Sequence, residues 1–281
     1  MKRSLRIIVT SVLPIVSNSV GVHRDRSDPP LPTFLIIGAQ KSATRWLRQN
    51  LGEHPDIFTS PYEIGFFNSP KRFESLGTEW YRAQFDGWDG EPIVGEATPG
   101  YMMWRHEPSA VAKRINDTIP DVRLIAILRN PVDRANSALV HHIKHERLHP
   151  RSSLVDLARE RPPERDRLAL IAGGWYAASL QPYRSAFGER LCVMLHDDIR
   201  NDPGTAYETA LRHVGGSPGF VPPGLDELVF SNQQGNSSQW KRDISPADRE
   251  ALHGYFRDDL RELEQMIGRD LSVWEPDLPR T

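Results

Sequence analysis

The residue with the clearest chemical potential is Lys41, which lies in a short polar loop after an apolar run. The run comprises residues 34–37, and apolar residues return at helical spacing from Trp46 onward. In such a strand–loop–helix unit, unpaired N–H groups of the loop and first helical turn point at one spot, where the helix dipole adds positive charge. Lys41 supplies a full charge, and Ser42 and Thr44 supply hydroxyl donors. The pattern predicts a phosphate cradle for a nucleotide, although an ordinary strand–loop–helix joint has the same outline.

A second candidate anion site follows another apolar run, residues 122–128. Arg129 comes directly after this run, and Ser137 lies eight residues later, about two turns along the helix that Pro131 is expected to open. A guanidinium fork and a hydroxyl group suit a phosphate, although Arg129 could equally pair with a carboxylate. Because ligands of parallel sheets bind beyond the carboxyl ends of the strands, Lys41 and Arg129 are expected on one rim. Together they indicate a ligand with two separated phosphates.

Apolar runs that alternate with helical patterns determine the expected fold. The runs expected as strands are residues 34–37, 57–59, 92–96, 122–128 and 191–195. After the first helix, residues 71–86 are expected to be partly helical, and the segments expected as helices are residues 108–116, 131–147, 168–187, 203–214 and 246–267. This alternation predicts a three-layer α/β/α domain with a central, mainly parallel sheet and a P-loop-like nucleotide-binding fold. The segment from His149 to Arg167 is rich in Pro, Arg and Glu and is expected to be a mobile surface excursion.

Composition limits the class of protein. With 281 residues, 38% apolar and 26% charged, the chain is expected to form one large domain over residues 33–281, after a loosely ordered segment over residues 1–32. The net charge of −2 gives no reason to expect nucleic acid or an anionic membrane as a partner, so any anion site must be local. The single cysteine, Cys192, excludes an intramolecular disulfide and is expected to be a buried, inert thiol.

The N-terminus has a charged start, Met1-Lys2-Arg3, before an apolar run over residues 7–16. That order resembles a secretory signal, but a run of about ten residues is too short to span a bilayer, and no small-residue cleavage site follows. A loosely ordered segment is therefore favoured over a signal or an anchor. Without disulfides or a convincing signal, we expect a cytoplasmic protein with no stable membrane insertion.

The Lys41 and Arg129 blocks together resemble the nucleotide-binding signatures of sulfotransferases that use 3′-phosphoadenosine 5′-phosphosulfate (PAPS). The first block, FLIIGAQKSATRWLRQNLGEHPDIF, is similar to the 5′-phosphosulfate loop of that family, and the second, RLIAILRNPVDRANSAL, to its 3′-phosphate block. Three further stretches complete the family's order of motifs: SPYEIGFFN, GERLCVMLHDDIRNDPGTAYETALRHVGG and REALHGYFRDDLRELEQMIGRDLSVW. The resemblance covers residues 34–274, apart from the segment between Pro150 and Arg167.

The resemblance implies a role for each matching residue. Lys41 would contact the 5′-phosphosulfate and its bridging oxygen, and the rest of the loop would come from Ser42, Ala43, Thr44 and Arg45. Arg129 and Ser137 would hold the 3′-phosphate. The stretch SSQWK stands where the heparan-sulfate type has a cofactor loop. In that role Trp240 would stack on adenine and Lys241 would supply positive charge. The alternative is that the stretch is an ordinary surface loop. The product would be adenosine 3′,5′-bisphosphate, and the family requires no metal.

Sulfuryl transfer also needs a base that takes the proton from the acceptor. The first candidate is Glu63, because EIGFF matches a family loop whose glutamate serves as base. The second is His141, one helical turn after Ser137, where the N-sulfotransferase branch has a catalytic histidine; an unperturbed histidine suits proton transfer near neutral pH. Lys41 would neutralise charge on the leaving phosphate, by analogy with phosphoryl transfer. Glu96 could be structural or bind the acceptor, and a structural role is favoured.

Three positions depart from the heparan-sulfate type of this family. Gly65 and Asn68 stand where its glutamate-bearing loop often has His and Asp, and Ala97 stands where it often has Lys. Since these family residues serve acceptor recognition and activation of the base, neither property is carried over to this chain from the resemblance.

A row of histidines follows on the same predicted helix. His141, His145 and His149 recur at intervals of four residues, and two histidines one turn apart can bind zinc. No third ligand of suitable type is evident in the sequence. A solvated or acceptor-facing basic stripe is therefore favoured over a metal site.

These observations lead us to expect a PAPS-dependent sulfotransferase that acts on a hydroxyl group, in preference to an amine, of a carbohydrate, glycolipid or secondary metabolite. A P-loop kinase or NTPase is the first alternative, but the loop lacks the glycine that precedes lysine in a full Walker A pattern, and no separate magnesium-binding carboxylate is obvious. A non-catalytic nucleotide-binding protein with the same fold is the second alternative, because of the departures just described. The oligomeric state is left open by the sequence.

Overall fold

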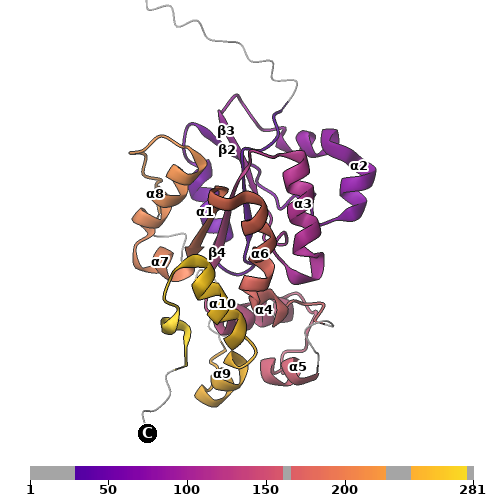
Figure 1. Ribbon diagram of the computed structural model, residues 1–281, viewed down its shortest axis with the longest axis vertical. Helices are drawn as coiled ribbons and strands as arrows, with labels where there is room; N and C mark the ends of the chain where they lie inside the picture. The colour runs from indigo at the N-terminus through magenta and orange to yellow at the C-terminus, as the bar shows by residue number, and fades with distance from the viewer. Residues whose placement is uncertain (1–28, 161–165, 226–241, 277–281) are drawn as a thin grey trace, which may run out of the picture.

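The computed structural model describes residues 29–160, 166–225 and 242–276. Its centre is a five-stranded sheet in the order β2-β3-β1-β4-β5, in which every neighbouring pair is parallel (Figure 1). The strands are β1 (Phe34–Gly38), β2 (Ile57–Thr59), β3 (Ile93–Ala97), β4 (Arg123–Leu128) and β5 (Leu191–Leu195). All five coincide with predicted strands, and the parallel α/β architecture is confirmed.

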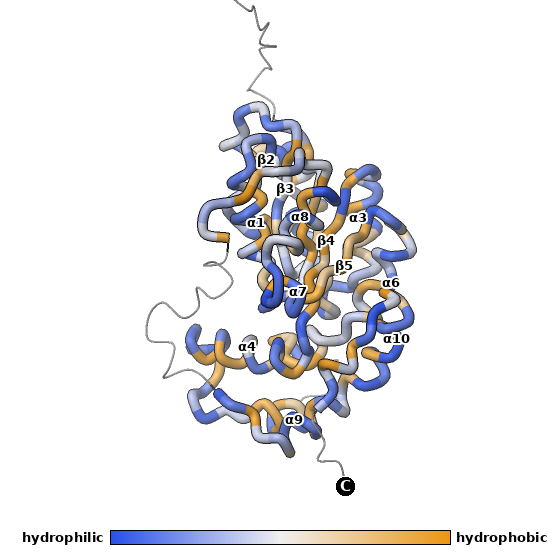
Figure 2. The backbone as a smooth tube through the Cα atoms, turned by 90° about the vertical axis from the view of Figure 1, so that its left-hand side faces the viewer, coloured by the Kyte–Doolittle hydropathy of each residue, from blue (hydrophilic) through white to orange (hydrophobic). Residues whose placement is uncertain are grey.

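The central strand β1 is apolar throughout because both of its faces are covered. Leu35 and Ile37 belong to the core on one side of the sheet, and Phe34 and Ile36 belong to the core on the other side. This alternation follows from the pleat, which points successive side chains to opposite faces. Buried parallel strands therefore read as continuous hydrophobic runs, and Figure 2 shows the same apolar character along β4.

Helices cover both faces of the sheet and give the three layers predicted from the sequence (Figure 1). One face packs against α1 (Thr44–Gly52) and α8 (Pro203–Val214). The other face packs against α3 (Pro108–Thr118) and α6 (Tyr176–Phe187). The remaining helices are α2 (Pro70–Arg82), α4 (Pro131–Lys144), α5 (Leu154–Glu160), α7 (His196–Asn201), α9 (Pro246–His253) and α10 (Arg257–Ile267).

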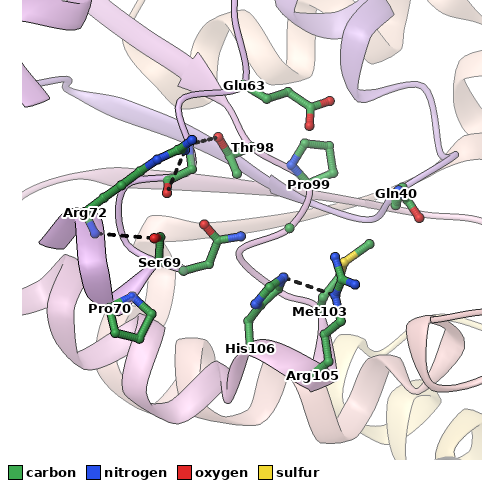
Figure 3. A pocket seen from close by; sticks show the side chains of 13 residues that line it. Gln40, Glu63, Ser69, Pro70, Arg72, Thr98, Pro99, Met103, Arg105 and His106 are labelled. Atoms are coloured by element: carbon green, nitrogen blue, oxygen red, sulfur yellow. Dashed lines mark hydrogen bonds between the residues drawn. The ribbon is translucent and has the colours of Figure 1, made fainter. Parts of the chain in front are cut away.

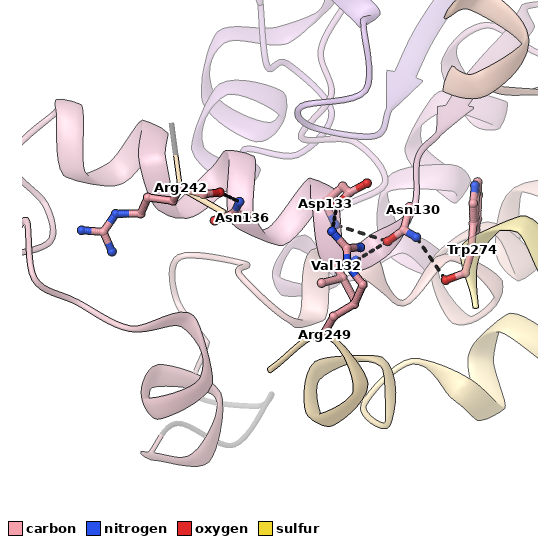
Figure 4. A network of polar contacts seen from close by, with 7 residues as sticks. All are labelled: Asn130, Val132, Asp133, Asn136, Arg242, Arg249 and Trp274. Atoms are coloured by element: carbon pink, nitrogen blue, oxygen red, sulfur yellow. Dashed lines mark hydrogen bonds and ion pairs between the residues drawn. The ribbon is translucent and has the colours of Figure 1, made fainter. Parts of the chain in front are cut away.

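Helix α4, which follows the Arg129 block directly, is fixed at its start by local capping and by distant parts of the chain. The Asn130 side chain accepts hydrogen bonds from the backbone of Val132 and Asp133 at 3.0 and 3.3 Å, and its amide donates to the Trp274 carbonyl at 3.1 Å (Figure 4). Asp133 pairs with Arg249 of α9 at 2.7 Å. The C-terminal part of the chain thus holds the helix that carries the second anion candidate.

Several predicted helices differ from the observed ones. The helix expected over residues 131–147 ends at Lys144, and the one expected over residues 168–187 begins only at Tyr176. The second difference arises because the Asp166 carboxylate accepts hydrogen bonds from the backbone of Ile171 and Ala172 at 2.6 and 3.1 Å, which holds the preceding residues in turns. The helix expected over residues 246–267 is two helices, and α7 is absent from the prediction.

The break between α9 and α10 has a packing reason. Phe256 is fully buried in the turn between them, and α9 packs against α4 and α5, whereas α10 packs against α6. A single straight helix could not reach both surfaces. The chain therefore turns after His253, where the backbone of Gly254 and Tyr255 closes tight hydrogen-bonded turns.

The segment from His149 to Arg167, expected to be a mobile surface excursion, contains α5, so that expectation was wrong for its central part. Four consecutive or near-consecutive side chains of this helix are buried: Leu154, Val155, Leu157 and Ala158. The helix packs against α4 and α9. The outer face of the helix carries the charged residues that dominate the composition of the segment. Because of them, the apolar face was not recognised in the sequence. Residues 161–165 lie outside the described part of the chain.

Two further expectations concern the surface and the termini. Cys192 is partly rather than fully buried, and burial raises the pKa of its thiol to about 11, which keeps it protonated and unreactive near neutral pH. Within residues 29–160, 166–225 and 242–276, no helix has the length and apolarity needed to cross a membrane. Residues 1–28 lie outside the described part, so the boundary at residue 32 stays a prediction.

Replacement of Leu154 by Ala tests whether α5 is packed into the domain. We expect the free energy of unfolding to fall by about 2 kcal/mol or more, because the substitution leaves a cavity under the helix. Urea denaturation followed by circular dichroism measures this loss. Arg159→Ala, on the exposed face of the same helix, is the control and should change stability by less than about 0.5 kcal/mol. Equal, small effects of both substitutions would mean that the helix is not packed.

Candidate active site

The loop between β1 and α1 lies at the carboxyl end of the central strand. The backbone N–H of Ala39 donates to the Ile127 carbonyl of β4 at 2.7 Å, which ties the loop to the neighbouring strand. Lys41 and Ala43 have φ angles of 71° and 67°. Alternation between left- and right-handed residues points successive N–H groups to one side and forms a nest for an anion. Helix α1 then begins at Thr44 without a side-chain cap, so its first N–H groups remain free for a ligand.

Ser42 gives independent evidence for a ligand at this loop. The residue is 0% exposed, and its hydroxyl group has no hydrogen-bond partner among the described residues. An unpaired buried polar group costs about 1–3 kcal/mol, so nearly all such groups in native proteins have partners. An oxygen of a bound phosphate or phosphosulfate would satisfy this hydroxyl. The loop therefore fits the group that its sequence predicts.

Lys41 and Arg129 share one rim of the sheet, as predicted. Arg129 follows the end of β4, and its Nη1 donates to the backbone carbonyl of Lys41 at 3.2 Å. Tyr176, at the start of α6, donates its hydroxyl hydrogen to the Arg129 carbonyl at 2.7 Å. These contacts fix the arginine backbone and direct its guanidinium group toward the loop, so the two predicted anion sites form one continuous surface.

The electrostatics of this rim favour an anion. The pKa of Lys41 is lowered, first by burial and then by repulsion from Arg129 and Lys144, while Glu63 opposes the shift. Cations held together without water or counter-ions are destabilised, and an arriving polyanion relieves both their desolvation and their mutual repulsion. The site is thus arranged for a ligand with several negative charges.

Ser137 and Arg134, both on α4, occupy different environments. Ser137 is partly buried, about two turns into the helix that begins after Arg129, and its contact with a phosphate stays a prediction. Arg134 is fully buried, and its guanidinium group donates to the carbonyls of Ala169 and Leu170. Arg134 therefore fixes the turn before α6.

Glu63 stands at the mouth of a pocket with a volume of about 620 Å³ (Figure 3). The loop that follows it is buried and held by three contacts from other elements. Thr98 accepts from the backbone of Gly65 at 3.1 Å, the Tyr101 hydroxyl accepts from the backbone of Phe66 at 3.2 Å, and Arg72 donates to the Ile64 carbonyl. The carboxylate of Glu63 is therefore carried by a rigid support although the side chain itself is exposed.

The carboxylate of Glu96 organises this support. Glu96 is fully buried in β3 and accepts hydrogen bonds from the hydroxyl groups of Tyr81 at 2.9 Å, Thr98 at 2.6 Å, and Tyr101. Burial raises the pKa of Glu96, and its hydrogen bonds oppose that shift by stabilising the charged form. Because Thr98 and Tyr101 in turn hold the Glu63 loop, Glu96 has the structural role expected from the sequence.

The departures from the heparan-sulfate type have a local explanation. Gly65 has a φ of +63°, and a Cβ atom there would lie 2.9 Å from Nη1 of Arg72, so glycine leaves room for the arginine that binds the loop. Asn68 also lines the pocket, and its side chain lies close to both Gly65 and Gly100. Ala97 is buried in the core at the end of β3 and adds no charge.

The environment of Glu63 favours a base with a raised pKa. Neighbouring protein atoms displace part of the water around its carboxylate, and this desolvation raises the pKa. Arg48 and then Lys41 lower it by attraction. Arg48 is itself held by a hydrogen bond from its Nη1 to the Ser60 carbonyl at 3.1 Å. The balance leaves a carboxylate that accepts a proton more readily than one in free solution, beside the cations of the anion rim.

His141 lies on the same side of the site as Lys41. Its pKa is lowered to about 4, first by burial and then by repulsion from Lys41 and His145. It is therefore neutral near physiological pH and can accept a proton, but it is a weaker base than the unperturbed histidine assumed from the sequence. Its ring lies 4.2 Å from that of His145. Among the described residues, no group of three metal-ligating side chains could hold an ion.

The remaining predicted loop residues divide between the interior and the surface. Thr44 is buried at the start of α1, Ala43 is partly buried, and Arg45 is exposed. Trp240 and Lys241, predicted to contact adenine and to supply charge, lie outside the described residues. Their roles stay predictions.

Sequence reasoning missed several residues of the rim. His196 follows β5 directly, and its pKa is lowered to about 4 by burial and then by Arg129. The rule that located Arg129, a polar residue immediately after an apolar strand, would also have found His196. No local signal identifies Lys144 or Tyr176, because their positions depend on how α4 and α6 pack.

Known proteins that are similar to this chain are sulfotransferases. A model of the sulfotransferase domain matches residues 31–262. The bifunctional heparan sulfate N-deacetylase/N-sulfotransferase 4 of Mus musculus is 27% identical over 290 aligned residues, which cover 89% of this chain and 32% of that protein. The heparan sulfate glucosamine 3-O-sulfotransferase 6 of Homo sapiens is 38% identical over 106 residues, or 38% of this chain and 29% of that protein. The chain thus spans about a third of the length of these curated relatives.

A solved structure of a sulfotransferase is also similar to this chain over most of its length. The sulfotransferase from Alicyclobacillus acidocaldarius superimposes with a TM-score of 0.71 at 32% identity, covering 87% of this chain and 99% of that one. The fold and the order of the elements that carry the site are therefore shared with a sulfotransferase.

Replacement of Tyr101 by Phe tests the support of the Glu63 loop. We expect a loss of about 1–3 kcal/mol in the free energy of unfolding, because Glu96 loses a donor and the backbone of Phe66 loses its acceptor. Chemical denaturation measures the loss. Tyr62→Phe removes the same atom from a side chain that is 74% exposed and should be nearly neutral. If both substitutions are neutral, the network does not hold the loop.

Proposed function

The chain belongs to the sulfotransferase family, and we propose that it transfers a sulfuryl group from PAPS to a hydroxyl group of a carbohydrate, glycolipid or secondary metabolite. The observation that carries the donor assignment is the rim on which Arg129 binds the backbone of Lys41 beside the unpaired, buried hydroxyl of Ser42. Backbone N–H groups, a hydroxyl and clustered cations match the donor's phosphosulfate and phosphate groups.

The residues of the rim divide into two roles. When bound, PAPS supplies the sulfuryl group and a phosphate that leaves as part of adenosine 3′,5′-bisphosphate. Lys41 is the residue that stabilises negative charge on the bridging oxygen, since it extends from the loop beside the unpaired N–H groups. Arg129 and Ser137 hold the 3′-phosphate, which fixes the donor along the carboxyl ends of β1 and β4. No metal is required for these roles.

Glu63 is the proposed base. It takes the proton of the acceptor hydroxyl as the oxygen–sulfur bond forms, and its raised pKa makes the carboxylate a better acceptor of that proton. His141 assists or substitutes, since it is neutral and lies near Lys41. Both relatives described above are named after heparan sulfate, one as an N- and one as a 3-O-sulfotransferase, which supports a glycan acceptor. A hydroxyl acceptor is placed first because Glu63, and not His141, lines the pocket.

Calorimetric titration with adenosine 3′,5′-bisphosphate, without magnesium, tests the donor site. We expect binding by the wild type and a loss of about 1.5–3 kcal/mol, or roughly ten- to a hundredfold in affinity, on Lys41→Ala or Arg129→Ala, because each removes a charged partner of a phosphate. Lys113→Ala is the control, since this lysine pairs with Asp117 on the exposed face of α3. A preference for ATP with magnesium would contradict the proposal and favour a P-loop kinase or NTPase.

The base is tested by turnover and its pH dependence. Glu63→Gln should lower kcat by about 10²–10⁴-fold while leaving the affinity for adenosine 3′,5′-bisphosphate unchanged. A protonated carboxyl group cannot accept a proton, so the wild-type kcat/KM should fall as pH drops through the raised pKa of Glu63, at higher pH than for an ordinary glutamate. This acid limb should vanish in Glu63→Gln. His141→Ala is the comparison: if it removes the limb and Glu63→Gln does not, histidine is the base, and if neither loses turnover, both assignments are wrong.

A further inference from the structure

The pocket beside Glu63 contains a second charged element that the proposed reaction does not use. Its wall opposite the Glu63 loop is formed by Met103, Arg105 and His106, close to α3 (Figure 3). In this view Glu63 projects into the pocket from one side, and Arg105 projects from the other. With a volume of about 620 Å³ the space accommodates an acceptor of sugar size or larger between them.

The guanidinium group of Arg105 is held in place by two hydrogen bonds. Its Nη1 donates to the Arg167 carbonyl at 2.7 Å, and its Nε donates to Nε2 of His106 at 3.2 Å. An arginine has five N–H donors, so these contacts leave further donors on the terminal nitrogens for a ligand. A side chain that is already fixed loses little conformational entropy when it binds.

His106 supports this arrangement by staying neutral. Its pKa is lowered to about 4, first by burial and then by repulsion from Arg105, so near neutral pH its Nε2 accepts the arginine's hydrogen bond. A neutral histidine offers no countercharge. In the part of the chain that the structure describes, the pair thus presents to the pocket one positive charge that no carboxylate pairs with.

The two arginines of the pocket are used differently. Arg72 donates to the carbonyls of Ile64 and Gly65 and lies over the ring of Trp80, so it serves the Glu63 loop. Arg105 is exposed and forms no ion pair with any carboxylate in the described part of the chain. Of the described residues that line this pocket, only Glu63 is acidic, and it is assigned to the proton transfer.

We propose that Arg105 binds a carboxylate of the acceptor, and that the enzyme therefore selects hydroxyl acceptors bearing a carboxylate, such as a uronic acid, over neutral ones of the same shape. The inference rests on the proposed function. A guanidinium fork matches a carboxylate in a planar, two-bonded geometry, and such charge-assisted bonds are short and strong. With the carboxylate at Arg105, the acceptor spans the pocket, and a hydroxyl group on its other side meets Glu63.

Two probes that differ only in this group provide the test. The protein is first saturated with adenosine 3′,5′-bisphosphate, which measures the donor site by itself, and is then titrated with 4-nitrophenyl β-D-glucuronide or 4-nitrophenyl β-D-glucoside. We expect the glucuronide to bind at least tenfold more tightly to the wild type. Arg105→Gln should remove this preference while the affinity for adenosine 3′,5′-bisphosphate stays the same, which also shows that the variant is folded. Arg212→Gln, an exposed arginine of α8, should retain the preference.

The outcomes separate this inference from the proposed function. Failure to bind adenosine 3′,5′-bisphosphate would count against the donor site and remove the basis of both proposals. With donor binding intact, equal affinity of the wild type for both probes, including no measurable binding of either, overturns the role of Arg105. So does a preference for glucuronide that survives in Arg105→Gln. Arg105→Lys, which keeps the charge and loses the fork, should fall between the wild type and Arg105→Gln.

Discussion

The constraint on which the site depends is the enforced proximity of like charges at the carboxyl ends of β1 and β4. Lys41 and Arg129 repel each other, yet the Arg129 guanidinium is bonded to the lysine backbone and the Arg129 carbonyl is held by Tyr176. Asp259 of α10 in turn accepts hydrogen bonds from the backbone of Ala177 and Ala178 at 3.0 Å, which anchors the helix that carries this tyrosine. The scaffold thus holds these cations together at an electrostatic cost that Glu63 offsets in part and that an anionic ligand offsets further, so affinity and specificity for a polyanion have one origin.

The acceptor side depends on the adjacent strand through a different device. Glu96 of β3 pairs in register with Leu35 of β1, six residues before Lys41, so the support of the Glu63 loop and the phosphate loop are attached to neighbouring strands. A buried carboxylate is unfavourable unless its hydrogen bonds are satisfied, and here three hydroxyl groups satisfy it. Any displacement of the Glu63 loop would break part of this network. The distance between base and donor loop is therefore set by the sheet, not by flexible surface segments.

The parts of the site that were predictable are those encoded locally. Apolar runs mark the strands, and the polar residue that follows each run must lie at the same edge of a parallel sheet, which is why Lys41 and Arg129 could be paired from the sequence. The predictions that were wrong concern features that depend on contacts between distant parts of the chain. The start of α6 is set by Asp166, an acceptor that looks like any surface aspartate in the sequence, and the packing of α5 is hidden by its charged outer face. Arg105 was missed because its neighbours across the pocket come from distant segments.

The two candidate bases respond to the same surroundings in opposite ways, and this links them to donor binding. Removal of water disfavours the charged form of each, so the pKa of Glu63 rises and that of His141 falls. Lys41 adds to the shift of His141 and opposes that of Glu63. An anion that neutralises Lys41 therefore raises both pKa values: it strengthens Glu63 as a base and makes His141 able to hold a proton nearer neutral pH. In the proposed reaction, proton transfer from the acceptor would thus be favoured when the donor is in place, because the lysine proposed to bind the donor also contributes to the pKa shifts of both residues.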